Sequence, residues 1–165
     1  MQPKSDHLDA LSNVVVIDDD ASVRRSVATM LDRAGYAVTL YESADEFLKK
    51  PLLPTPAVVV LDMRMPGTSG VALQSQLKTL SQSAAVVFVS GDSRPDEIIA
   101  AMKQGAVDFL LKPFSAQAML EAVQKASLVA EQLAMQSKKQ LKVSERLARL
   151  TPRELEICHW MVRGY

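Results

Sequence analysis

The chain has 165 residues, 48% of them hydrophobic, and its 19 Lys and Arg residues balance its 19 Asp and Glu residues. This length suits one ordinary domain with an appendage, and the hydrophobic content excludes an intrinsically disordered chain. A single cysteine, Cys158, excludes an intrachain disulfide, and with no secretory signal or membrane-length apolar run we expect a soluble cytoplasmic protein with no membrane partner.

Charge is distributed unevenly along the chain. Residues 1–114 carry 11 basic and 14 acidic side chains, whereas residues 115–150 carry six basic and three acidic ones. The acidic balance of the first part argues against a general nucleic-acid binder. The basic excess of the second part is typical of a solvated helix face.

Five short apolar runs punctuate the chain between residues 14 and 111. They are rich in valine and bounded by turn residues, and this uniform apolarity is typical of strands covered on both faces of a parallel sheet. The runs are Val14–Ile17, Ala37–Tyr41, Ala57–Leu61, Val86–Val89 and Phe109–Leu111.

Helical patterns fill the intervals between these runs. The first helix keeps its apolar residues on one face and ends at Gly35. Serine side chains are placed to cap later helices: Ser43 in a capping box with Glu46, then Ser93, then Ser115. Five strands alternating with five helices predict an α/β fold, a (βα)5 doubly wound parallel sheet.

The sequence from Ser115 to Leu150 contains neither glycine nor proline. A continuous helix there would be about 54 Å long, more than the last helix of such a domain needs. Its second part is therefore predicted to be a linker or pairing helix, although its heptad pattern is poor. A new helix start follows, with Thr151 as N-cap, Pro152 at the first helical position and Glu154 completing a capping box.

Polar side chains follow four of the predicted strands. Asp18 and Asp19 follow the first strand, Asp62 the third, Ser90 the fourth and Lys112 the fifth. Ligands of a doubly wound sheet bind outside the carboxyl ends of its strands, so these side chains are expected to converge. Two carboxylates about 4 Å apart repel by roughly 4 kcal/mol at an effective dielectric constant of 20, so the cluster needs a counter-charge.

This acidic cluster predicts a site for a hard divalent cation, Mg²⁺ or Mn²⁺, because such ions prefer oxygen ligands. Asp19 and Asp62 are expected to bind the ion directly, and Asp18 through water. Asp20 is expected outside the cluster, near the helix start, where a negative charge is favoured.

A metal beside a carboxylate at a strand tip favours phosphoryl chemistry. Asp62 is the expected nucleophile, forming an aspartyl phosphate. Lys112 would neutralise charge, and Ser90 would donate a hydrogen bond to a phosphoryl oxygen.

The segments VVVIDDD, VVVLDMRMPGTSG, VVFVSGDS and AVDFLLKPF together resemble the receiver domain of bacterial two-component response regulators over residues 12–128. The resemblance implies a flavodoxin-like receiver fold in which Asp18 and Asp19 are the metal-binding acid pair. It implies that Asp62 accepts a phosphoryl group from a sensor histidine kinase. Such a protein is not an enzyme toward other substrates and catalyses only its own phosphoryl transfer and dephosphorylation.

The same resemblance assigns further roles around the strand ends. The carbonyl of Arg64 completes the metal shell, Lys112 contacts the phosphoryl group, and the Lys112–Pro113 bond is expected to be cis. Ser90 and Phe109 form the switch pair, and their rearrangement is expected to drive homodimerisation through the surface of the fourth helix, fifth strand and fifth helix, or through the linker helix.

The tail LTPRELEICHWMVRGY is similar to the opening helix of the LuxR-type helix-turn-helix domain in FixJ/NarL-type transcription factors. The predicted organisation is therefore a flexible N-terminus (1–11), a receiver domain (12–128), a helical linker (129–149) and the start of an incomplete helix-turn-helix domain (150–165). Specific DNA binding uses a recognition helix, which this sequence lacks, so DNA is an expected partner only through the missing part.

Three alternatives remain open at this point. A haloacid-dehalogenase-like phosphatase would use Asp18 as nucleophile with Asp20, and would take GDSRPD at 91–96 as its late acidic motif. A flavodoxin-like electron carrier would need a glycine- and hydroxyl-rich turn after the first strand, where three aspartates stand instead. A degenerate receiver would act as an interaction module without phosphorylation.

Overall fold

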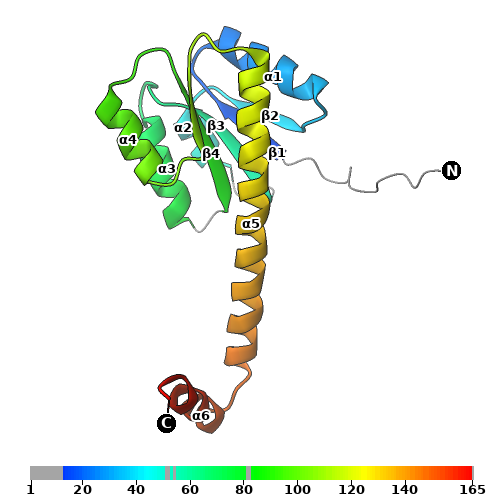
Figure 1. The fold of residues 1–165 in the computed structure, drawn as a ribbon, viewed down its shortest axis with the longest axis vertical. Coiled ribbons are helices and arrows are strands. Elements are labelled where there is room, and N and C mark those ends of the chain that lie inside the picture. The colour runs from blue at the N-terminus through cyan, green and yellow to red at the C-terminus, as the bar shows by residue number, and fades with distance from the viewer. Residues whose placement is uncertain (1–12, 51–52, 54, 81–82, 165) are drawn as a thin grey trace, which may run out of the picture.

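The computed structural model describes residues 13–164 except 51, 52, 54, 81 and 82 (Figure 1). The predicted flexible N-terminus, residues 1–11, lies outside the described residues. Five parallel strands form one sheet in the order β2-β1-β3-β4-β5. The strands are β1 Asn13–Ile17, β2 Val38–Tyr41, β3 Ala57–Asp62, β4 Ala84–Ser90 and β5 Asp108–Leu111.

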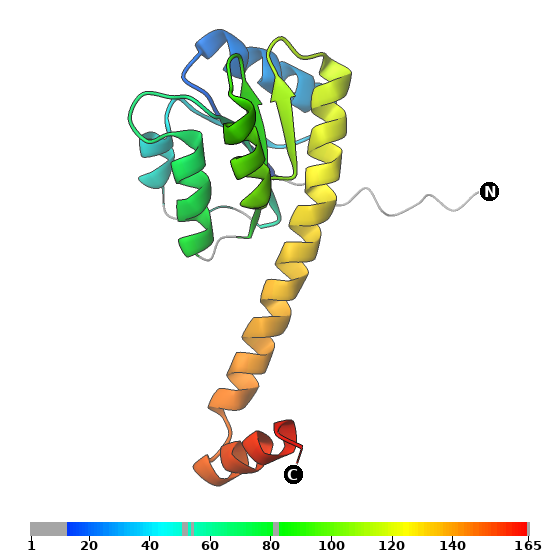
Figure 2. The ribbon, with the colours of Figure 1, turned by 60° about the vertical axis from the view of Figure 1, so that its left-hand side comes forward.

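Helices cover both faces of this sheet, which is the predicted doubly wound (βα)5 arrangement (Figures 1 and 2). The helices are α1 Ala21–Arg33, α2 Ala44–Leu48, α3 Gly70–Thr79, α4 Pro95–Lys103, α5 Ala116–Ala148 and α6 Pro152–Val162.

Alternation along the central strands divides the hydrophobic core into two layers. In β1, Val14 and Val16 face the layer covered by α1 and α5, whereas Val15 and Ile17 face the layer covered by α2, α3 and α4. Successive strand residues point to opposite faces of a sheet, so a strand buried on both sides must be apolar at every position.

The two edge strands depart from the prediction that every strand is covered on both faces. That prediction is confirmed for β1, β3 and β4, but β2 and β5 are only partly buried, and Leu111 of β5 is 59% exposed. Edge strands have a neighbour on one side only, so helices that centre on the middle of the sheet leave them partly open to solvent.

The predicted helix caps Ser43, Ser115 and Thr151 are confirmed, whereas the cap at Ser93 is wrong and the capping box at Ser43 is incomplete. Ser93 does not cap α4: Arg94 is the N-cap residue, and its backbone N–H donates to the Glu97 carboxylate at 3.0 Å. At α2, the side chain of Ser43 accepts from the backbone N–H of Glu46, but the Glu46 carboxylate accepts from Glu42 instead of completing the box on Ser43.

Helix α5 is one continuous helix of 33 residues. Its buried residues all lie in the first half, and beyond them the helix runs away from the sheet (Figure 2). A hydrogen bond of 2.6 Å joins the hydroxyl groups of Ser137 and Ser83 beside the start of β4. The predicted division between receiver and linker at residues 128 and 129 thus falls inside an uninterrupted helix, and that division stays a prediction.

Helix α6 follows α5 after a short turn and has no buried residue among those described. Thr151 and Glu154 form the predicted capping box, with the Thr151 N–H donating to the Glu154 carboxylate at 2.8 Å. None of the described helices combines the length and the apolar run that a membrane crossing requires.

Candidate functional site

Three carboxylates meet at the carboxyl ends of β1 and β3. Ile17 and Leu61 are paired in register, so the chain places Asp18 and Asp62 side by side one residue later. One carboxylate oxygen from each of Asp18, Asp19 and Asp62 lies within 4.8 Å of the others. Asp18 and Asp62 are buried and Asp19 is exposed, so the cluster opens to solvent on one side.

Lys112 reaches this acidic cluster from the end of β5. Its Nζ donates to Asp18 Oδ2 at 2.7 Å and to Asp62 Oδ2 at 3.4 Å. Partial burial lowers the pKa of Lys112, but the hydrogen bond to Asp18 and the negative charges of Asp18 and Asp62 outweigh it, so the net shift is upward. The ammonium group therefore stays charged, and it is shared between the two buried acids.

Asp62 is the acid whose ionisation the structure disfavours. Burial and then the negative charge of Asp18 raise the pKa of Asp62 to about 6, against the opposing effects of the Arg64 N–H and Lys112. One ammonium group thus does not fully offset the crowding of the carboxylates. A further positive charge in the pocket would favour the ionised, nucleophilic form of Asp62.

Neighbouring groups hold the turn after β1 in place. The backbone N–H of Asp20 donates to Asp18 Oδ1 at 2.9 Å, and the Arg24 guanidinium donates to the Asp18 carbonyl at 2.6 Å. The Asp20 carboxylate turns away and caps α1, accepting from the N–H groups of Ser22 and Val23. Asp20 therefore lies outside the acidic cluster, as predicted, whereas no spacing in the sequence had singled out Arg24.

The loop after β3 is fitted closely around Asp62. The Arg64 N–H donates to Asp62 Oδ1 at 3.2 Å, while its guanidinium forms an ion pair with Glu97 of α4 at 2.8 Å. At Gly70 any side chain would collide with the carbonyl oxygen of Asp62, so glycine is required there. The Lys112–Pro113 peptide bond that closes the other side of the pocket is cis.

Ser90 ends β4 beside the acidic cluster, but its hydroxyl group bonds to its own loop. The Ser90 hydroxyl donates to the Asp92 carbonyl at 3.1 Å and accepts from the Ser93 hydroxyl at 2.6 Å. Phe109, paired in register with Phe88, is partly buried against the layer of α2, α3 and α4. The structure thus brings Asp18, Asp19, Asp62 and Lys112 into contact or near-contact, and it leaves Ser90 at the end of β4 and Phe109 on β5 outside this group.

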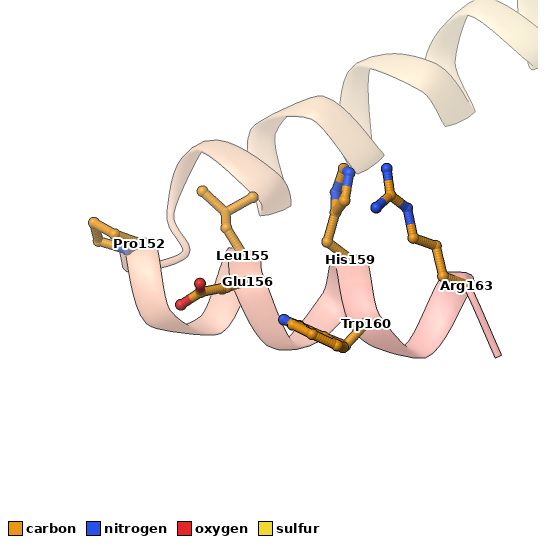
Figure 3. Close-up of a pocket in the computed structure, with 6 residues that line it drawn as sticks. All are labelled: Pro152, Leu155, Glu156, His159, Trp160 and Arg163. Atoms are coloured by element: carbon orange, nitrogen blue, oxygen red, sulfur yellow. The ribbon is translucent and has the colours of Figure 1, made fainter. Parts of the chain in front are cut away.

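A separate hollow of about 610 Å³ lies along α6, far from the acids (Figure 3). Trp160 extends on the side of the helix opposite Leu155 and His159 (Figure 3). The hollow is lined by exposed side chains of this one helix, so its size reflects an open surface and not an enclosed site. Among the described residues, the acidic cluster is the group that can hold a hard cation and present a carboxylate nucleophile.

Comparison with known proteins gives consistent matches over most of the chain. The response regulator receiver domain model matches residues 14–124. The transcriptional regulatory protein FixJ of Bradyrhizobium diazoefficiens is 34% identical over 152 residues, which cover 92% of this chain and 74% of FixJ.

Solved structures give the same result. The response regulator StyR superposes with a TM-score of 0.77 at 34% identity, covering 94% of this chain and 79% of that one. The beryllofluoride-activated receiver domain dimer of NtrC4 superposes with a TM-score of 0.67 at 31% identity, covering 73% of this chain and 99% of that one.

Proposed function

Because this chain belongs to the response regulator receiver domain family, we propose that it accepts a phosphoryl group on Asp62 from a sensor histidine kinase. The observation that carries this proposal is the pairing of Asp62 with Lys112 inside a cluster of three carboxylates. A buried carboxylate with a raised pKa, beside a charged ammonium group and an open acidic edge, is suited to phosphoryl transfer and not to structural support.

The chemistry follows from the groups around Asp62. A carboxylate oxygen of Asp62 attacks the phosphorus atom of a phosphohistidine, an O–P bond forms, the N–P bond breaks, and the histidine ring leaves with its electron pair. Lys112 lies 3.4 Å from Asp62 Oδ2 and would bond an oxygen of the transferred group. Phosphoryl transfer depends on positioning and charge neutralisation, which these fixed side chains provide.

The acidic cluster fits Mg²⁺ or Mn²⁺. One carboxylate oxygen from each of the three acids lies within 4.8 Å of the others, and oxygen atoms are the ligands that these ions prefer. Asp18, Asp19 and Asp62 would hold the ion, together with the carbonyl of Arg64. When bound, the ion would supply the positive charge that favours ionised Asp62 and that offsets the charge of the phosphoryl group.

The proposed output is dimerisation. Phosphorylation adds three acceptor oxygens, and Ser90 would turn to donate to one of them, leaving space for Phe109. The neighbouring surface carries the exposed apolar side chains of Ile99 and Met102 on α4 and Leu111 on β5. Burying such a surface between two copies favours a homodimer, and the second half of α5 is the alternative pairing surface. The beryllofluoride-activated receiver domain of NtrC4 is a dimer.

Helix α6 is proposed to be the start of a LuxR-type helix-turn-helix output domain, which the second half of α5 joins to the receiver. FixJ and TdiR, which are relatives of this chain, are transcriptional regulators. We expect no specific DNA binding from α6 alone, because sequence-specific reading needs a recognition helix in the major groove.

The test is intact-mass analysis after incubation with acetyl phosphate and Mg²⁺. We expect one phosphoryl adduct, which is absent in Asp62→Asn and absent with a chelator, whereas the matched variant Asp20→Asn keeps it. Reduction of the acyl phosphate followed by peptide mapping should place the adduct on Asp62. An adduct on Asp18 would indicate the phosphatase-like chemistry instead, and no adduct in the wild-type protein would indicate an interaction module without phosphorylation.

A further inference from the structure

Ser93 is the residue whose observed role differs most from its expected one. Its hydroxyl group does not cap α4 but lies 2.6 Å from the Ser90 hydroxyl, to which it donates, and 3.2 Å from the sulfur of Met63. Ser90 is 1% exposed and Ser93 is half-buried, so water competes weakly for this hydrogen bond.

The hydrogen bonds of Ser90 are all used within its own loop. A serine hydroxyl has one proton to donate and two lone pairs with which to accept. In Ser90 the proton goes to the Asp92 carbonyl, one lone pair accepts from the Asp92 N–H at 3.3 Å, and the other accepts from Ser93. Ser90 therefore has no proton free for a group on Asp62 while this arrangement lasts.

We propose that Ser93 is a latch that holds Ser90 in the resting orientation, in competition with the phosphoryl group on Asp62. This inference rests on the proposed function, because it takes Asp62 as the acceptor. To donate to a phosphoryl oxygen, Ser90 must turn its proton away from the Asp92 carbonyl, and the geometry that accommodates Ser93 is lost with that turn. Ser93 is thus a positioning residue that acts through Ser90.

The hydrogen bond from Ser93 to Ser90 also connects the acidic cluster to α4. Ser93 directly precedes Arg94, the N-cap residue of α4, so a Ser93 released from Ser90 frees the first turn of the helix on that side. On its other side the same turn is held by the ion pair of Glu97 with Arg64, two residues after Asp62. Helix α4 has one buried residue, Ala101, and few apolar contacts oppose its movement once these polar contacts are broken.

The experiment is a titration of the full chain with beryllofluoride at fixed Mg²⁺, followed by fluorine NMR. Ser93→Ala removes the hydrogen bond to Ser90 and therefore destabilises the resting state alone. The half-saturating concentration of beryllofluoride should fall about fivefold, which corresponds to about 1 kcal/mol. Ser93→Thr, which keeps the hydroxyl group, should stay within about twofold of the wild type. Ser127→Ala is the matched control, because the Ser127 hydroxyl donates to a carbonyl within α5, at Val123.

A second measurement separates a latch from a general loss of packing. Without beryllofluoride, the Phe109 ring resonances of Ser93→Ala should move toward their positions in the bound wild type, and those of Ser127→Ala should not. Equal or weaker binding by Ser93→Ala, with normal binding by the wild type, would overturn the latch and leave the proposed function standing. No binding by the wild type would overturn both.

Discussion

Residues 116–130 of α5 lie against the sheet, whereas residues 131–148 of the same helix keep a hydrogen bond from Ser137 to Ser83, then extend away from the sheet and carry α6 (Figure 2). The first part contributes all five buried residues of the helix, and three of them, Ala122, Ala126 and Ala130, follow one another at intervals of four. Small side chains at that spacing form a single stripe, which lets the helix pack closely on the valine-rich strands.

The second part keeps the helix but loses the stripe. Met135 and Leu141 are each more than 60% exposed. Both parts have good helix-forming sequences, so backbone propensity does not distinguish them. What distinguishes them is burial: the first part packs on the receiver, whereas the second carries α6 and leaves apolar side chains exposed.

The largest expected effect comes from placing the same charge in each environment at neighbouring positions of α5. Ala126→Asp puts a carboxylate against the buried face and should lower the free energy of unfolding by about 3 kcal/mol or more. Leu128→Asp, two residues later on the exposed face, should cost about 0.5 kcal/mol. Urea unfolding of both variants measures the difference, and equal losses would show that α5 does not pack as described.

At the acidic cluster, burial of a side chain lowers the stability of the folded receiver. Because the pKa of Asp62 is raised from 3.8 to about 6, the folded state binds the Asp62 proton more tightly, and stability falls as pH rises through this window. In chelator at pH 8, Asp62→Asn should therefore raise the free energy of unfolding. After allowance for solvent around the pocket, we expect about 1–2 kcal/mol.

This gain should largely disappear near pH 3, which lies below both the folded pKa of about 6 and the ordinary value of 3.8, so that Asp62 of the wild type is mostly protonated in both states. Thermal unfolding at the two pH values provides the measurement. Glu145→Gln, on the exposed part of α5, is the matched control and should change stability at neither pH. A loss of stability in Asp62→Asn at pH 8 would mean that Lys112 neutralises the pocket without help from a metal ion.

The smallest expected effect compares two helix caps. Ser115 caps α5 at its packed end and Thr151 caps α6, and each side chain accepts from a backbone N–H three residues on. Ser115→Ala should lower the global free energy of unfolding by about 1 kcal/mol. Thr151→Ala should leave the global transition unchanged, because α6 buries nothing, and should increase amide exchange within α6 about fivefold. A shift of the global midpoint in Thr151→Ala would indicate that α6 unfolds together with the receiver.

The sheet was predictable from the sequence because its central strands are uninterrupted apolar runs. Val14–Ile17 and Ala57–Leu61 each differ from the observed strand by one residue, and the side chains that follow them meet where parallel strands end. The contact of Lys112 with the acidic cluster was also predictable, because strand order in a doubly wound sheet places the fifth strand beside the fourth.

Contacts that depend on how loops and helices pack together were not predictable. Ser93 has the spacing of a helix cap, but its hydroxyl bonds Ser90 because the loop packs onto Met63, 30 residues earlier. The ion pair of Arg64 with Glu97 likewise joins residues 33 apart on exposed elements. Local spacing shows which hydrogen bonds a serine or arginine is able to make, and the tertiary packing decides which of them forms.

Because α5 is one unbroken helix, its length determines both the distance of α6 from the receiver and the orientation of α6 about the helix axis. Each residue of an α-helix turns the chain by about 100° and advances it by about 1.5 Å. Deleting one residue between 131 and 148 would therefore rotate α6 by about 100° about the axis of α5. Deleting seven residues would shorten α5 by about 10 Å and would nearly restore the original orientation of α6. Only insertions or deletions of about seven residues in this half of α5 therefore preserve the orientation of α6 about the axis of α5.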